Sequence, residues 1–310
     1  MNQREIKKNL NLLSQIWSWA QRSPKMAGCL LLFLLLAGGI VGLGYLFLKW
    51  RQSPNTPTPS TTKPPAAGNA KELNSLLGNP GNAKADTGSA NNYLMVKSAY
   101  TLSYNRQRGT SNWASWHVST SDLGDLERTN NFRPDSSLPA NWVRVTPNDY
   151  TGSGYDRGHI CPSADRTADA DSNSETFLMT NMMPQTADNN RGPWEKMEAF
   201  TRSLVKRGRD AFVIAGSYGD AKQLRGKVTV PTNTWKIVVI VPQGLRDASQ
   251  INNSAQVIAI NIPNVEGIKE DDWRKYRTTV RALEQATGYD LLSNLRPDVQ
   301  KALESRVDNQ

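Results

Sequence analysis

The sequence contains few of the side chains that zinc sites and disulfide frameworks require. Of its 310 residues only two are histidines, His117 and His159, and only two are cysteines, Cys29 and Cys161. Two histidines and one thiol in the globular part leave too few ligands for an ordinary zinc centre. Cys29 lies in an apolar run and Cys161 in the globular part, so we expect no disulfide between them, and the pair does not indicate a compartment.

The larger, C-terminal part of the sequence also has little excess charge. The formal net charge of the chain is +9, but residues 1–90 carry ten Lys and Arg against three Asp and Glu, which is +7. Residues 91–310 carry twenty-seven against twenty-five, which is only +2. Overall basicity therefore does not indicate nucleic-acid binding, which has to be argued from individual arginines.

One long apolar run lies near the N-terminus, where Met26–Leu48 contains no charged residue. About 20 residues at about 1.5 Å of rise each cross the hydrocarbon core of a bilayer, so the run predicts a transmembrane anchor over residues 26–49. Basic residues are more numerous before the run than after it, which predicts a cytoplasmic tail over 1–25 and an extracytoplasmic remainder. The alternative is a secreted protein with a cleaved signal peptide, although the run is longer than an ordinary signal core.

Two further regions follow the apolar run. Residues 50–91 are rich in Pro, Thr, Ser, Asn and Gly, a composition that buries too little apolar surface to fold and that predicts a disordered linker. The composition becomes globular near Tyr93, which predicts one folded domain over residues 92–310.

The expected secondary structure of this domain mixes strands and helices without a regular βαβ rhythm. Two early segments, Tyr93–Tyr104 and Ser111–Ser119, are expected to form a hairpin. Apolar and β-branched runs predict further strands at Phe212–Ala215, Trp235–Val241 and Val257–Ile262. Helical periodicity predicts helices at Trp194–Arg207 and Asp271–Thr287. The mixture favours an α+β fold.

The most informative stretch is Tyr155–Pro162, which reads YDRGHICP and places an acid, a base, a glycine and an imidazole at consecutive positions. Asn190 follows 31 residues after His159, and Trp194, Glu198 and Arg202 follow at spacings of four. Helix positions four apart share a face, so Glu198 and Arg202 can both point toward whatever Asn190 holds.

These residue types meet the needs of phosphodiester hydrolysis. An imidazole can take a proton from an attacking water, because its pKa lies near neutral pH. A divalent cation and arginines can stabilise the charge that develops on the phosphate and on the departing 3′ oxygen. Mg²⁺ prefers oxygen ligands and keeps several waters, so one asparagine amide oxygen supported by a carboxylate is an adequate anchor.

The combined pattern DRGH, N-x-x-P-Q and N-x-G-x-W-x-x-x-E resembles the DNA/RNA non-specific endonucleases of the ββα-metal (His-Me finger) class. Within that family it is most similar to the cyanobacterial sugar-non-specific nucleases. The resemblance runs from about residue 93 to residue 310 and includes the segment TGYDLLSNL near the C-terminus. The pattern as a whole is highly specific, whereas DRGH alone is not.

The resemblance implies a role for each matching residue. His159 would be the general base, Asn190 the direct ligand of Mg²⁺, with Mn²⁺ as a substitute, and Glu198 the residue that holds a metal-bound water. Arg128 would stabilise the transition state at the phosphate, with Arg157 and Arg202 as further phosphate contacts. Supporting residues would be Asp156, for the finger, and Asn181 and Gln185, around the metal site.

The resemblance also implies a fold and an activity. A central antiparallel β-sheet would be layered with helices, and a strand–strand–helix finger would run from about Gly154 to Lys206. Phosphate contacts carry no sequence information, so hydrolysis of both DNA and RNA without sequence specificity is expected. The competing functions are a membrane-tethered nucleic-acid receptor for DNA uptake and a phosphodiesterase of small nucleotides. A protein inhibitor is a further candidate partner, and the sequence leaves the oligomeric state open.

Several residues near these motifs have a plainer interpretation. We expect His117 to be structural. Cys161 lies two residues after His159, but that spacing does not force a thiol–imidazole pair, so a thiol hydrolase is not favoured. Core packing rather than base stacking is expected for four tryptophans, Trp113, Trp116, Trp142 and Trp235.

Overall fold

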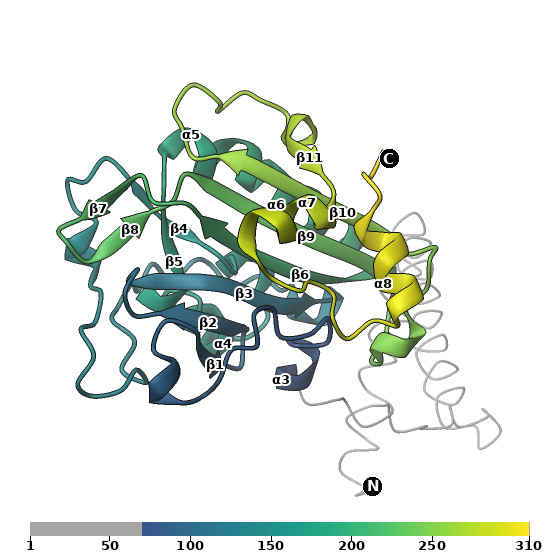
Figure 1. Cartoon of the computed structure of the whole chain (residues 1–310), viewed down its shortest axis with the longest axis horizontal. Coiled ribbons are helices and arrows are strands. Elements are labelled where there is room, and N and C mark those ends of the chain that lie inside the picture. The colour runs from purple at the N-terminus through teal and green to yellow at the C-terminus, as the bar shows by residue number, and fades with distance from the viewer. Residues whose placement is uncertain (1–69, 310) are drawn as a thin grey trace, which may run out of the picture. The chain divides into compact units, whose positions relative to one another are not determined.

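The computed structural model describes residues 70–309, and an antiparallel seven-stranded sheet forms their centre (Figure 1). The strand order is β1-β2-β3-β6-β9-β10-β11. The strands are β1 Tyr93–Val96, β2 Thr101–Asn105, β3 Thr110–Val118, β6 Arg209–Tyr218, β9 Asn233–Pro242, β10 Gln256–Pro263 and β11 Arg277–Thr278. A segment of about ninety residues between β3 and β6 leaves the sheet, and it contains the motifs singled out in the sequence.

The predicted finger is present in this segment. Strand β4, Asp156–His159, pairs antiparallel with β5, Met182–Gln185, and places His159 opposite Met182. The chain then forms α5, Ala187–Asn189, a wide turn η6, Asn190–Trp194, and α6, Glu195–Lys206. The apolar side of α6 packs on the sheet as expected: Met197 and Val205 are fully buried in the core, and Phe200 and Leu204 pack against it.

The sheet has an apolar core on each face because alternate side chains of a strand point to opposite sides. In β9, Trp235, Ile237 and Val239 belong to one core together with residues of the C-terminal helices. Val238 and Ile240 belong to the other core, which α6 covers. The four tryptophans that were expected to pack in the core are all buried there.

The remaining elements are short. They are the helices α3 Ala70–Leu73, α4 Ala170–Glu175, α7 Val280–Thr287 and α8 Pro297–Glu304, the hairpin β7 Lys222–Leu224 and β8 Val228–Val230, and the 3₁₀ turns η1 Thr87–Ser89, η2 Thr120–Asp122, η3 Pro147–Asp149, η4 Ser163–Asp165, η5 Met179–Asn181, η7 Ala248–Gln250 and η8 Trp273–Tyr276.

Two predicted elements have wrong boundaries. Tyr93–Tyr104 is two strands rather than one, because a turn closed by the Lys97 N–H bonding to the Tyr100 carbonyl separates β1 from β2. The predicted helix Asp271–Thr287 is an α-helix only in its second half, and its first half forms the 3₁₀ turn η8. Thr279 caps α7 by accepting a bond from the Ala282 N–H at 3.0 Å, and the two residues before Thr279 pair with β10 instead.

The C-terminal boundary of the linker predicted over residues 50–91 is wrong, because the folded part of the chain already includes residues before 91. Leu73, Leu77 and Ala83 are buried in one of the two cores, and Lys84 bridges to Tyr93. A few apolar side chains in a polar segment are enough to dock it on an existing sheet, which an average over composition does not reveal. The tail over 1–25, the anchor over 26–49 and the linker up to residue 69 lie outside the described residues. From residue 70 to 309, no helix has the length and apolar character needed to cross a bilayer.

Candidate active site

A cavity of about 510 Å³ opens beside the finger. Its lining includes all six residues that the sequence predicted to act on the phosphate or the metal: Arg128, Arg157, His159, Asn190, Glu198 and Arg202. They come from the loop after β3, from β4, from η6 and from α6, and the ββα arrangement brings them together. Asp156 does not line the cavity but contacts Asn190 directly.

His159 is held in the cavity wall by two aromatic rings. Its imidazole meets the Phe177 ring edge-on, with centroids 4.9 Å apart, and lies 5.5 Å from the Phe132 ring. The Nε2 atom is buried and has no hydrogen-bond partner within residues 70–309, which leaves Nδ1 as the nitrogen that faces the cavity. Burial, reinforced by the charge of Arg128, lowers the pKa of His159 to about 3. The ring is therefore neutral near pH 7 and can accept a proton.

Asn190 is oriented by an acid on the neighbouring strand. Its Nδ2 donates to Asp156 Oδ2 at 2.9 Å, and Arg191 holds the same carboxylate through two further bonds of 2.7 and 2.9 Å. With Nδ2 fixed on Asp156, the amide oxygen of Asn190 is the atom left for the cavity. Gly192 makes this geometry possible, because the Lys269 carbonyl lies 2.7 Å from where a Cβ at position 192 would be.

Glu198 reaches the cavity from α6 and is nearly buried. Its Oε1 accepts a bond of 2.9 Å from Lys236 Nζ, and the two side chains are 11% and 2% exposed. Burial raises the pKa of Glu198, whereas the charges of Lys236 and Arg202 oppose that rise. The pairing of two buried charges explains how each is tolerated in the interior.

Besides Arg191, three arginines line the cavity, and they are held in two different ways. Arg202 donates to the buried Asp165 at 3.0 Å, and the Trp116 indole N–H donates to the other oxygen of that carboxylate at 2.9 Å. Arg128 instead lies over the Phe177 ring at 4.9 Å and Arg157 over the Phe132 ring at 4.6 Å. In the described part of the chain no carboxylate forms an ion pair with Arg128 or Arg157, so both charges are available to an anion.

The other two predicted supporting residues act on the finger and do not line the cavity. Asn181 is fully buried, and its side chain makes two hydrogen bonds to the backbone of Cys161. Its Oδ1 accepts from the Cys161 N–H at 3.0 Å, and its Nδ2 donates to the Cys161 carbonyl at 2.8 Å. The Gln185 amide lies 1.9 Å from where a Cβ at Gly158 would be, so that position in DRGH requires glycine. Asn181 thus joins η5 to Cys161, which lies just after the end of β4, whereas the buried amide of Gln185 makes no hydrogen bond among residues 70–309.

Two residues of the site were missed in the sequence analysis, Lys236 and Asp165. Lys236 could have been found from the sequence, because it is the single charged residue in the apolar run Trp235–Val241. A lysine in a buried strand needs a partner for its charge. Asp165 gave no comparable signal, because only the fold brings it to Arg202 and Trp116.

The other chemically interesting groups lie apart from this cavity. His117 is buried, bonded to Asp210 at 3.2 Å and packed on Phe212, in agreement with a structural role. Burial raises the pKa of the Cys161 thiol well above its usual value, which removes the thiolate that a cysteine hydrolase would need. Among residues 70–309, one group of three acids is close enough to hold a metal, Glu284, Asp290 and Glu304, and none of these lines the cavity.

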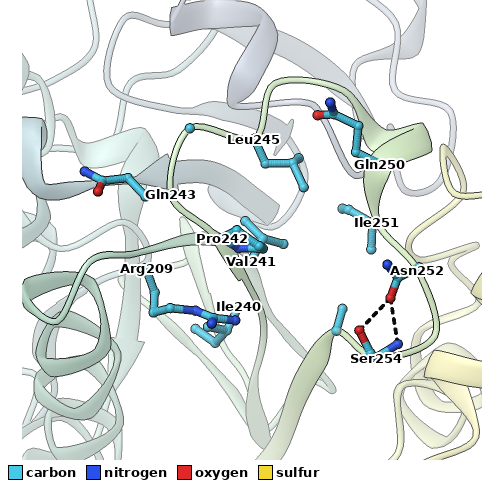
Figure 2. Close-up of a pocket in the computed structure, with 12 residues that line it drawn as sticks. Arg209, Ile240, Val241, Pro242, Gln243, Leu245, Gln250, Ile251, Asn252 and Ser254 are labelled. Carbon is cyan, nitrogen blue, oxygen red and sulfur yellow. Dashed lines mark hydrogen bonds between the residues drawn. The ribbon is translucent and has the colours of Figure 1, made fainter.

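A second cavity, of about 610 Å³, lies at the end of β9 and in the following loop (Figure 2). Its lining includes Arg209, Leu245 and Ile251 but contains no histidine, cysteine or carboxylate. It therefore lacks a group that could act as a general base.

Comparison with known proteins identifies the family. The sequence model of the DNA/RNA non-specific endonucleases matches residues 77–298. A nuclease of Nostoc sp. is 53% identical over 235 residues, covering 76% of this chain and 85% of the relative. The nuclease of Serratia marcescens is 31% identical over 233 residues, covering 71% and 82%.

A solved structure shows the same fold. The crystal structure of the EndoG/EndoGI complex contains a chain that superimposes with a TM-score of 0.62 at 23% identity, over 76% of this chain and 96% of that one. The fold, the family match and the curated relatives agree with one another. This chain belongs to the DNA/RNA non-specific endonuclease family and is a nuclease.

Proposed function

We propose that this protein hydrolyses phosphodiester bonds of DNA and RNA without sequence specificity, with His159 as the general base. The observation that carries the proposal is the convergence on one cavity of a neutral imidazole, an oriented amide oxygen and two arginines without carboxylate partners. Each supplies a different requirement of the reaction, and no other described cavity combines them.

His159 has the properties of a base for water. Its ring is held in one orientation by Phe132 and Phe177, so no rotation is needed before a proton moves to Nδ1. The lowered pKa keeps the His159 ring unprotonated near pH 7, which is the form that accepts a proton, but it also makes the imidazole a weaker base than one with a pKa near the working pH. The attacking water would lose its proton to Nδ1 as its oxygen bonds to phosphorus and the 3′ oxygen departs.

The same cavity suits a magnesium ion. Asn190 offers an oxygen whose direction is set by the bond from Nδ2 to Asp156, and Glu198 offers a carboxylate that could accept a bond from a water on the ion. One protein oxygen with several waters is an arrangement that Mg²⁺ accepts, and Mn²⁺ takes similar ligands. When bound, the ion would neutralise charge that develops on the phosphate and on the departing oxygen.

The arginines account for substrate breadth. Arg128 and Arg157 lie over aromatic rings at the cavity and present charge to phosphate, which every nucleotide of DNA and RNA carries. Contacts to phosphate position a strand but do not read its bases, so neither sequence nor sugar is selected by them.

Replacing Asp156 with alanine is expected to raise the half-saturating Mg²⁺ concentration about 10–100-fold, the usual effect of removing a group that orients a metal ligand. The Asn190 amide would lose the acceptor that fixes it. The matched control is Asp156→Asn, whose amide oxygen can still accept from Asn190, so most of the affinity should remain. Mg²⁺ titrations of the cleavage rate compare the three proteins, and equal Mg²⁺ dependence in wild type and Asp156→Ala would contradict the orienting role.

The proposed activity is tested by incubating the purified chain with supercoiled plasmid and, separately, with a long RNA. We expect both polymers to be degraded to a continuous range of sizes in Mg²⁺, and cleavage to stop when EDTA removes the ion. Intact polymers with a retarded electrophoretic mobility would instead identify a nucleic-acid receptor. Cleavage of dinucleotides at a rate equal to that of polymers would identify a phosphodiesterase of small substrates.

A further inference from the structure

Lys236 occupies a place where lysine is seldom found. It is 1% exposed and lies in β9, opposite Ala215 of β6 and Ile260 of β10. Its neighbours along the strand, Trp235 and Ile237, point into the core on the far face of the sheet. The Lys236 side chain therefore points to the face that α6 covers. Lysine is almost never fully buried unless its charge is paired, so its contacts should explain its position.

The ammonium of Lys236 is held by three groups. Its Nζ lies 2.9 Å from Glu198 Oε1, 3.9 Å from the centroid of the Trp194 ring and 5.9 Å from that of Trp116. Aromatic faces attract a cation most strongly where water is excluded, as it is here. Trp194 is the last residue of η6 and Glu198 lies in the first turn of α6, so Lys236 connects the central sheet to the start of the helix that borders the cavity.

Within residues 70–309, the bond from Lys236 is the one hydrogen bond that the Glu198 side chain makes. The cavity cation Arg202 donates to Asp165 instead. The orientation of the Glu198 carboxylate in the cavity therefore depends on its bond to Lys236. Lys236 itself does not line the cavity and touches neither substrate nor ion.

We propose that Lys236 is a positioning residue of the nuclease site, which fixes Glu198 through Oε1 and so leaves Oε2 to serve the cavity. The proposal rests on the proposed function of Glu198 as the acceptor for water on the ion. A charge at position 236 holds the carboxylate in one rotamer, whereas a neutral side chain leaves it free to turn toward Arg202. The site then loses the preorganised Glu198 carboxylate as a hydrogen-bond acceptor for water on the ion.

A double-mutant cycle tests the proposal with four proteins: wild type, Lys236→Met, Glu198→Gln and the combination. Methionine approximates the length and apolar stem of lysine without its charge. In the wild-type background we expect Lys236→Met to lower kcat about 10–100-fold and to raise the half-saturating Mg²⁺ concentration, with KM for DNA changed less than about threefold. In the Glu198→Gln background the same substitution should change kcat less than about threefold, because the group it acts through is gone.

Two readouts do not depend on cleavage. Mn²⁺ affinity, measured by electron paramagnetic resonance without DNA, should fall in Lys236→Met. The Tm of the metal-free protein should also fall in Lys236→Met, which leaves Glu198 buried without a partner, and should recover in the combination, which leaves no unpaired charge. If Lys236→Met does not fold, Lys236→Gln replaces it in the cycle, because glutamine keeps a donor without the charge.

The outcomes separate this proposal from the function it rests on. A wild-type chain that cleaves nothing overturns the proposed function itself. An active wild type combined with an equal loss of kcat from Lys236→Met in both backgrounds, or with no loss, overturns only the role of Lys236. The matched control is Lys227→Met, which breaks a lysine–carboxylate pair of 3.0 Å with Asp149 away from the cavity and should leave kcat unchanged.

Discussion

Replacing His159 with alanine is expected to lower kcat about 10²–10⁴-fold, the range in which positioned general bases act. The variant loses the one imidazole that lines the cavity, which is the group that we propose takes the proton from water. Arg128 and Arg157 are untouched, and KM for DNA should stay within a few-fold of the wild-type value. Steady-state cleavage of a labelled duplex at saturating Mg²⁺ measures both constants.

The control for this variant is His117→Gln, which removes the only other histidine and leaves the cavity intact. It should cleave at nearly the wild-type rate at a temperature where it is folded. Alanine at position 159 also leaves a space beside Phe132 and Phe177, so His159→Gln serves as a larger second variant. A His159→Ala protein that is folded and cleaves at the wild-type rate would contradict the assignment of the base.

The pKa of His159 also predicts the pH profile of the wild type. Burial lowers that pKa to about 3, far below the usual value near 6.5, so the ring stays neutral as the pH falls from 8 to 5. At saturating Mg²⁺ the rate should therefore show no loss centred near pH 6.5. An inflection at that pH, absent from His159→Gln, would indicate a solvated imidazole instead of one enclosed by aromatic rings.

Replacing Asn190 with alanine is expected to raise the half-saturating Mg²⁺ concentration by about 100-fold or more, beyond the effect of removing a group that only orients a ligand. Asn190 supplies the single protein oxygen that we propose contacts the ion directly. Mn²⁺ binding measured without substrate should weaken in parallel with the activity. Asn148→Ala, an exposed asparagine outside the cavity, is the matched control and should bind Mn²⁺ normally. An unchanged affinity in Asn190→Ala would remove Asn190 from the metal site.

The finger could be predicted from sequence because its requirements are local. Gly158 has no room for a Cβ beside Gln185 of the paired strand, and Trp194 and Glu198 are four residues apart on one face of the finger. Such requirements leave short patterns of fixed spacing. Strand order, in contrast, depends on pairings such as β3 with β6, which are about ninety residues apart and leave no periodic signal.

The parts that could not be predicted depend on partners far away in the chain. Lys236 reaches Glu198 across 38 positions, and Asp165 reaches Trp116 across 49. The docking of Leu73 and Leu77 depends on a core made mostly by β9, β10 and the C-terminal helices. The composition of residues 50–91 predicted a linker because it is an average over the whole segment. Such an average does not show that a few leucines can pack against the core on one face of the sheet.

The most direct test of the account is to locate the ion and the imidazole around one phosphate. The wild-type protein would be crystallised with Mn²⁺ and an oligonucleotide in which a methylene group replaces the scissile 3′ oxygen, and the ion would be found by anomalous scattering. We expect Mn²⁺ between the Asn190 amide oxygen and the phosphate, with His159 Nδ1 facing the same phosphorus across the position of the attacking water. Mn²⁺ bound only at Glu284, Asp290 and Glu304, or a phosphate out of reach of His159, would contradict it.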